Sequence, residues 1–181
     1  MVKKVTKWTF LEPFLRTSEE LHLLDISRQL RENHATVRNY LNDFEKIGIL
    51  EKRNKGRLTL YRLIKENPLI IDYLCLAEKD KLIRKTKDNN ILKELVSLLH
   101  KETNKPTIIF GSAVEDLKKA NDIDILTTGN LDEEELEKII RRKIHLVKIS
   151  SLNKVTDSLK NEILKKHLII NSSEEVLKWL V

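Results

Sequence analysis

The sequence predicts an α+β protein with a basic domain over residues 1–66, a helical connector over 67–103 and a small α/β domain over 104–181. Apolar residues at helical spacing and then a hairpin pattern fill the first third of the chain, and short strands alternate with helices in the last third. Residues 1–66 carry 14 Lys/Arg against 9 Asp/Glu, whereas the remainder carries 20 against 19. A basic surplus confined to one domain indicates a polyanionic partner such as nucleic acid, or less favourably an anionic membrane surface.

The overall composition is that of a globular chain in a reducing compartment. Charged residues make up 34% of the 181 residues and hydrophobic residues 40%, with four Gly and three Pro. The single cysteine, Cys75, excludes a disulfide framework within the chain and a thiol-based metal cluster. No apolar run approaches the length of a membrane span. We therefore expect a soluble cytoplasmic protein that does not insert into membranes.

The first domain is expected to be a group of helices followed by a hairpin. The pattern predicts a short helix over residues 8–16 and a helix capped by Asp25 that runs to Leu30. An amphipathic helix is then predicted over 34–48, where Gly48 ends it. Strand-like runs over 49–52 and 58–64 flank the basic segment 53–57, which predicts a hairpin with a basic tip. Residues 52–65 contain six Lys or Arg and no acid.

This order resembles the winged helix-turn-helix domain of prokaryotic transcription regulators, over the stretch ISRQLRENHATVRNYLNDFEKIGILEKRNKGRLTLYRL. The resemblance implies that the helix after the turn enters the DNA major groove and that the hairpin lies along the backbone or in the minor groove. Arg and Asn can pair bidentately with guanine and adenine. Winged helices also serve as protein-interaction or dimerisation modules, so that alternative stays open. The implied contacts to double-stranded DNA are His34, Thr36, Arg38, Asn39, Lys52, Arg53, Lys55 and Arg57.

Two helices are predicted in the connector. Asn67-Pro68 is a helix start, and the helix continues towards Arg84. Residues 85–90 are expected to interrupt it before a second, leucine-rich helix over 91–101. The first of these helices could form the seam of a homodimer, or its leucines could belong to the internal core.

The last domain is organised around the stretch TIIFGSAVEDLKKANDIDIL, residues 107–126. A strand over 107–110 is predicted to turn at Gly111-Ser112 into a helix over 113–120, leaving backbone N–H groups free for a phosphate. Asp122 and Asp124 alternate with aliphatic residues, so both carboxylates are expected on one face of a strand. Paired carboxylates repel unless a cation lies between them, and Mg²⁺ prefers such oxygens. The alternative is a pair of solvated acids at a loop edge.

Further strands and helices follow in alternation. The pattern predicts a helix over 131–142, a strand over 144–149 and a helix over 151–166. A strand and a last helix, capped by Ser172 or Ser173, complete the chain.

Gly-Ser, a short helix and then Asp-Ile-Asp-Ile-Leu resemble the signature of minimal, prokaryotic or archaeal-type nucleotidyltransferases of the DNA polymerase β-like superfamily. The resemblance implies that Gly111 and Ser112 bind a nucleoside triphosphate, and that the catalytic Asp122 and Asp124 hold Mg²⁺ or Mn²⁺. The implied activity is transfer of a nucleoside monophosphate to an unidentified acceptor. Some small members act as antitoxins that modify a toxin, which makes a protein acceptor or toxin-like partner one expectation.

Two positions depart from this family pattern. Ala113-Val114-Glu115 stands where family members usually carry a small residue followed by Arg-Gly. His145, on the strand expected to supply a third carboxylate, occupies that carboxylate's position. The alternative hypothesis is therefore a transcription regulator whose nucleotidyltransferase-like domain is catalytically degenerate and serves nucleotide sensing or assembly. A third hypothesis is a module that binds only proteins.

Overall fold

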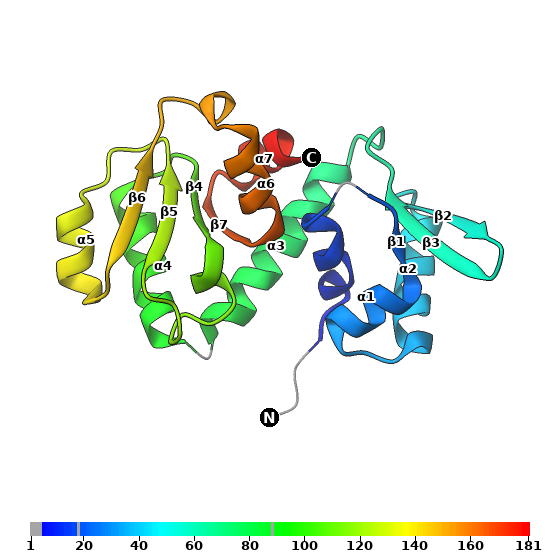
Figure 1. Ribbon diagram of the computed structural model, residues 1–181. Coiled ribbons are helices and arrows are strands. Elements are labelled where there is room, and N and C mark those ends of the chain that lie inside the picture. The colour runs from blue at the N-terminus through cyan, green and yellow to red at the C-terminus, as the bar shows by residue number, and fades with distance from the viewer. Residues whose placement is uncertain (1–4, 18, 88) are drawn as a thin grey trace. The chain divides into compact units, whose positions relative to one another are not determined.

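The chain forms two compact units, each with its own sheet, in the computed structural model (Figure 1). The structure describes residues 5–17, 19–87 and 89–181. One unit comprises residues 1–80 with Val181, and the other comprises residues 81–180. The predicted α+β class is confirmed. The division between the two units falls between residues 80 and 81, within a single helix. The predicted domain boundaries at residues 66/67 and 103/104 stay predictions.

The N-terminal unit follows the order of elements of a winged helix, as predicted. Its elements are η1 (Lys7–Leu15), β1 (Leu21–His22), α1 (Leu23–Leu30), α2 (His34–Lys46), β2 (Leu50–Lys55) and β3 (Leu58–Leu63). The three strands form an antiparallel sheet in the order β1-β3-β2, and β2 and β3 make the hairpin, or wing, visible in Figure 1. The core consists of buried apolar residues from every helix and from the sheet: Phe10, Leu11, Phe14, Leu15, Leu23, Ile26, Leu30, Val37, Leu41, Phe44, Ile49, Leu50 and Tyr61.

Three local expectations for this unit were wrong in detail. The first helix is a 3₁₀ helix that contains Pro13, a residue that cannot donate an α-helical hydrogen bond. Asp25 lies in the first turn of α1 and is not its N-cap, because the helix already begins at Leu23. The hairpin tip is shorter than 53–57: ladder pairing continues to Lys55 and Leu58, and the turn is Gly56-Arg57 alone. Gly56 has φ of +61°, which suits a two-residue hairpin turn.

The helix α3 (Ile70–Lys87) begins in the first unit and ends in the second. Its first part packs within the N-terminal unit. The hydroxyl of Thr6 donates to Asp80 Oδ1 at 2.9 Å, and the rings of Trp8 and Tyr73 lie 5.9 Å apart. The helix continues to Lys87, so the interruption expected over 85–90 is shorter than predicted; Asp88 lies outside the described residues.

The C-terminal unit is a four-stranded mixed sheet in the order β6-β5-β4-β7. Its strands are β4 (Thr107–Phe110), β5 (Ile123–Thr127), β6 (Ile144–Lys148) and β7 (His167–Asn171). The strand β4 pairs antiparallel with β5 and β7, and β5 pairs parallel with β6. The other elements are α4 (Asn90–Glu102), η2 (Gly111–Val114), α5 (Glu133–Ile140), η3 (Leu152–Lys154), α6 (Asp157–Lys165) and α7 (Ser173–Leu180).

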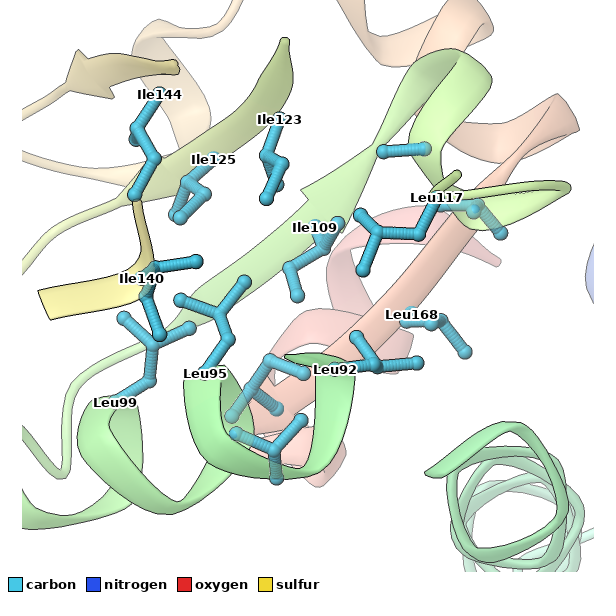
Figure 2. Close-up of a cluster of buried hydrophobic side chains, with 14 of the residues drawn as sticks. Leu92, Leu95, Leu99, Ile109, Leu117, Ile123, Ile125, Ile140, Ile144 and Leu168 are labelled. Carbon is cyan, nitrogen blue, oxygen red and sulfur yellow. The ribbon is translucent and has the colours of Figure 1, made fainter. Parts of the chain in front are cut away.

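The helix α4 is part of the core of this unit, although the sequence placed it in a connector. Asn89 caps it by accepting a hydrogen bond from the amide of Leu92 at 3.0 Å. Figure 2 shows leucines of α4 lying against isoleucines of the sheet. This packing explains the leucine spacing of residues 91–101 as the buried face of an amphipathic helix. The main buried residues are Leu92, Leu95, Leu99, Ile109, Ile123, Ile125, Ile144 and Leu168.

Two helices expected in this unit differ from the sequence prediction. Residues 113–120 form the end of η2 and an irregular loop instead of a helix. Arg142 donates to the carbonyl oxygens of Leu117 at 2.8 Å and Ala120 at 2.5 Å, so a side chain from another element satisfies backbone groups of this loop. The helix expected over 151–166 is divided into η3 and α6 by an extended Val155, with φ of −68° and ψ of 133°.

Candidate functional site

The start of α2 is a polar, exposed helix end. Asn33 caps the helix: its side-chain oxygen accepts a hydrogen bond from the amide of Thr36 at 2.8 Å. His34, Arg38 and Asn39 are exposed, whereas Thr36 is half-buried. Buried Val37, Leu41 and Phe44 hold the opposite face of α2 in the core. The core therefore orients the predicted DNA-contacting side chains outward, with Thr36 the least available of the four.

A hollow of about 200 Å³ lies between α2 and the wing. Arg38 from α2 and Arg57 from the wing turn both line it, so these two cations come from distant parts of the sequence to one surface. His22 of β1 also lines the hollow, a position that sequence reasoning missed because β1 is only two residues long and offers no alternation to read. The remaining lining residues are Leu23, Leu24, His34, Leu58 and Thr59.

The four predicted cations of the wing fall into two groups. Lys52 is half-buried, and its Nζ donates to Asn42 Oδ1 at 3.2 Å. Arg53 lies 3.5 Å from Glu20 Oε1 in an ion pair. Lys55 and Arg57 are exposed, and no ion pair to either is found within the described part of the chain. The end of the wing therefore presents two cations to solvent, and the other two are engaged by neighbouring side chains.

Tyr61, in β3, provides a hydrogen bond beneath this surface. It is fully buried, and its hydroxyl donates to the same Asn42 oxygen at 3.2 Å. Burial raises the pKa of the Tyr61 phenol above its ordinary value of 10.0; the charge of Glu45 adds to the increase and Arg38 opposes it. The phenol therefore stays neutral at physiological pH and acts as a fixed hydrogen-bond donor between β3 and α2.

In the C-terminal unit, Gly111, Asp124 and His145 come together at one corner of the sheet. Asp124 pairs with Phe110 on one side and with His145 on the other. The imidazole Nδ1 of His145 lies 3.1 Å from Asp124 Oδ1. A Cβ on Gly111 would lie 2.7 Å from Asp124 Oδ2, so the absence of a side chain at Gly111 is what admits this carboxylate. Gly111, Asp124 and His145 therefore lie together at this corner, and the binding and catalytic roles predicted for Gly111 and Asp124 stay predictions.

The structure does not reproduce all the other features predicted for this corner. The amide of Gly111 donates to the carbonyl oxygen of Lys166 at 3.2 Å, so it is not free for a phosphate. Ser112 is exposed. Asp122 precedes the first residue of β5 and is half-buried, so the alternation of the strand does not determine its direction. Among the described residues, no group of three or more His, Cys, Asp and Glu side chains is arranged to hold a metal ion.

The charge near the corner is mixed. Glu115 is exposed and forms an ion pair with Lys166 at 3.0 Å. A separate hollow of about 590 Å³ adjoins Lys148 at the other end of β6, and it is strongly acidic. Five of its lining residues are carboxylates, which would repel a triphosphate: Glu102, Asp132, Glu133, Glu134 and Glu135.

None of the helices in the described part of the chain has the length and apolar character needed to cross a bilayer. No protein-family model matches the chain, and none of the curated proteins compared with it shows a match.

Two solved structures are distantly similar to the chain. One is the adhesin competence repressor AdcR from Streptococcus pyogenes, with 19% identity over 56% of this chain and 84% of that chain, and a TM-score of 0.32. The other is TrmBL2, described as an archaeal chromatin protein with a novel mode of DNA binding. It has 16% identity over 79% of this chain and 62% of that chain, and a TM-score of 0.30. Because these scores are low, conclusions about function rest on the residues of this chain.

Proposed function

We propose that this protein is a transcription regulator that binds double-stranded DNA through its winged-helix unit. The observation that carries the proposal is the placement of Arg38 and Arg57 on one surface, formed by the start of α2 and the end of the wing. The first third of the chain also holds most of the net positive charge. An exposed helix beside a basic wing is the arrangement with which winged helices read DNA.

The two parts of this surface have different roles in the proposal. Arg38 and Asn39 on α2 present donors and acceptors that match base edges, and the major groove of B-DNA is wide enough to admit a helix. Lys55 and Arg57 are suited to phosphates, because their charges are exposed and no acid neutralises them among the described residues. The helix would therefore supply sequence discrimination, and the wing would supply affinity that depends on salt.

The proposal is tested by measuring the fluorescence anisotropy of a labelled duplex with the full chain at several salt concentrations. Replacing Lys55 and Arg57 together by Ala should lower the affinity and reduce the slope of log K against log salt by about 2, roughly one unit for each lost phosphate contact. The matched control replaces Lys46 and Arg62 by Ala. These cations carry the same total charge, but each is held by an acid, Asp43 and Glu51 respectively.

A second replacement examines the helix. Arg38→Ala should weaken binding to a selected duplex by about 1–3 kcal/mol while changing binding to unrelated duplexes less, because a base-edge contact carries discrimination. If both the wing variant and Arg38→Ala bind duplex DNA with unchanged affinity at low salt, the DNA-binding proposal is wrong.

The second candidate function concerns the Gly111 corner. The mixed sheet, with β4 antiparallel to β5 and β5 parallel to β6, places Asp124 against Gly111 and His145. This supports a nucleotidyltransferase-like domain in which Gly111 and Ser112 face a nucleoside triphosphate and Asp122 and Asp124 face Mg²⁺ or Mn²⁺. Because His145 already engages one oxygen of Asp124 and the Gly111 amide is hydrogen-bonded to Lys166, we favour nucleotide sensing or assembly over transfer chemistry.

This candidate is examined by titrating ATP into the full chain with and without Mn²⁺, and by assaying pyrophosphate release. Metal-dependent ATP binding that Asp124→Asn removes would support a nucleotide-sensing domain. Asp157→Asn is the matched control, because Asp157 is an exposed acid in the first turn of α6, away from the corner. Pyrophosphate release that depends on Asp124 would favour the enzyme, and failure to bind ATP under any of these conditions would exclude both readings.

A further inference from the structure

The helix α3 exposes a row of large apolar side chains. Leu69, Leu76 and Ile83 are 54%, 45% and 67% exposed. The amide of Tyr73 donates to the carbonyl oxygen of Leu69 at 3.2 Å, so helical hydrogen bonding reaches back to Leu69. Leu76 and Ile83 lie in α3, Leu69 immediately precedes its first residue, and the three are spaced by seven positions. Large apolar side chains aligned on an exposed helix face mark a contact surface.

Two exposed charged residues lie between these apolar residues on the same face. Asp72 and Lys79 are both exposed. Successive steps of three and four residues connect the five side chains, which is the spacing of a helix–helix seam. In chain order the row, which we call the α3 stripe, reads apolar, acid, apolar, base, apolar: Leu69, Asp72, Leu76, Lys79 and Ile83.

The opposite side of α3 already has a structural role. Ile70, Leu74 and Ala77 are buried, with at most 5% of their surface exposed. They follow one another at steps of four and three residues, as the inward face of an amphipathic helix does. The α3 stripe is therefore a second apolar row, in addition to the one that packs internally.

We infer that the α3 stripe pairs with the α3 stripe of a second copy of this chain in antiparallel orientation. Reversing the stripe keeps its apolar positions apolar and exchanges its acid for its base. An antiparallel partner therefore places Leu76 near Leu76 of the partner subunit, Leu69 near Ile83 of the partner subunit, and Asp72 near Lys79 of the partner subunit. The surface is complementary to itself, as an interface with two-fold symmetry requires.

A parallel pair does not satisfy the same residues. In that orientation Asp72 would face Asp72 of the partner subunit and Lys79 would face Lys79 of the partner subunit. Like charges at a helix seam repel, whereas opposite charges select the partner and its direction. The order of charges along the stripe thus selects the antiparallel orientation.

The interface has a modest size. From Leu69 to Ile83 the helix rises about 21 Å at 1.5 Å per residue. A single helix pair of this length buries less than the roughly 800 Å² per partner of a standard interface, so we expect a micromolar dimer. The dimer does not rest on the proposed DNA binding. If the chain both dimerises and binds DNA, the two winged helices of one symmetric dimer would recognise an inverted repeat.

The inference is tested by sedimentation equilibrium of the full chain without DNA, from about 1 μM to about 300 μM, a range that spans the expected dissociation constant. The wild-type chain should pass from monomer to dimer. Leu76→Glu should weaken the dimer at least tenfold, because two carboxylates would meet at the two-fold axis. Ile47→Glu is the matched control: Ile47 is 50% exposed, lies outside α3, and its replacement should leave the dimer unchanged.

Exchanging the two charges tests the orientation. Asp72→Lys and Lys79→Asp should each weaken the dimer, because each places like charges opposite one another. The double variant should restore the wild-type dissociation constant within about threefold, since it re-creates both pairs with their signs exchanged. Within one helix the two residues are about 10 Å apart along the axis, so recovery reports a contact between chains. Far-UV circular dichroism checks that every variant keeps its helices.

Three outcomes would overturn the inference. The first is a chain that stays monomeric throughout the concentration range. The second is a Leu76→Glu variant that dimerises like the wild type, which would place the dimer contact elsewhere. The third is a double charge exchange that is no tighter than the single variants, which would exclude the antiparallel pairing. None of these results depends on whether the protein binds DNA.

Discussion

Asp124 and His145 lie opposite each other on the parallel strands β5 and β6, with 3.1 Å between the carboxylate Oδ1 and the imidazole Nδ1. The other oxygen of the same carboxylate lies against Gly111. An imidazole thus stands beside one oxygen of Asp124, where it would compete with a cation for that oxygen.

Replacing His145 by Asp should make the C-terminal unit sensitive to divalent ions. Two carboxylates at this separation repel, so His145→Asp should lower the melting temperature in the presence of a chelator. Adding Mn²⁺ should recover stability, by about 2.7 kcal/mol at a metal concentration one hundred times the dissociation constant. Differential scanning calorimetry with and without Mn²⁺ measures the change, and His145→Asn is the control that adds no charge. A melting temperature indifferent to Mn²⁺ in the Asp variant would argue against a latent metal site.

Gly111→Ala should destabilise the C-terminal unit by more than the cost of its backbone conformation alone. Gly111 has φ of +75°, and a Cβ there would meet Asp124 Oδ2 at 2.7 Å. We expect a loss of about 2–3 kcal/mol, of which the left-handed backbone accounts for about 1 kcal/mol. Gly56→Ala in the wing is the control, because φ is +61° there and nothing lies within 4 Å of the added atom. Urea unfolding followed by a probe in each unit would separate the two costs, and equal losses would show that the contact with Asp124 is unimportant.

Glu20→Gln should increase the affinity for DNA. Glu20 forms the 3.5 Å ion pair with Arg53, so the replacement removes an acid beside the wing and leaves Arg53 available to a phosphate. The proposed interface should then gain up to one phosphate contact, and the slope of log K against log salt should steepen by up to about 1. Anisotropy titrations at several salt concentrations measure the slope. Glu19→Gln, which alters an exposed neighbouring acid, should have a smaller effect; equal effects would point to net charge alone.

Tyr61 should make the N-terminal unit lose stability at alkaline pH. Its folded-state pKa is raised above 10.0 by burial, so the folded state holds the phenolic proton more tightly than the unfolded state. This contribution is complete below pH 10 and is lost as the pH rises through the folded-state pKa. Tyr61→Phe should therefore show a shallower decline of the free energy of unfolding above pH 10, measured by urea denaturation. Near neutral pH the variant should be less stable by about 1 kcal/mol, because the hydrogen bond to Asn42 is lost.

Sequence patterns were sufficient where neighbouring residues decide the structure. The spacing of Val37, Leu41 and Phe44 predicted α2 and its outward polar face. The placement of His145 near Asp124 was an expectation from the nucleotidyltransferase resemblance, and the parallel register of β5 and β6 does bring the two residues opposite each other. Reasoning from spacing failed over residues 113–120. Helical spacing was present there, but Arg142 bonds the loop carbonyls from outside, and a long-range contact of this kind leaves no local trace.

The sequence by itself determined the α+β class, the winged-helix order of elements and the basic character of the first third. These follow from periodicity and charge, which are properties of local sequence. The register that brings Asp124 against Gly111 was decided by the tertiary structure. Only the tertiary structure decided which cations stay available, because Lys52 and Arg53 are engaged by Asn42 and Glu20 while Lys55 and Arg57 face solvent. It also decided which leucines of α3 are buried and which form the α3 stripe. Both outcomes depend on contacts between residues distant in sequence, and the energy of those contacts exceeds the local preferences that a sequence pattern expresses.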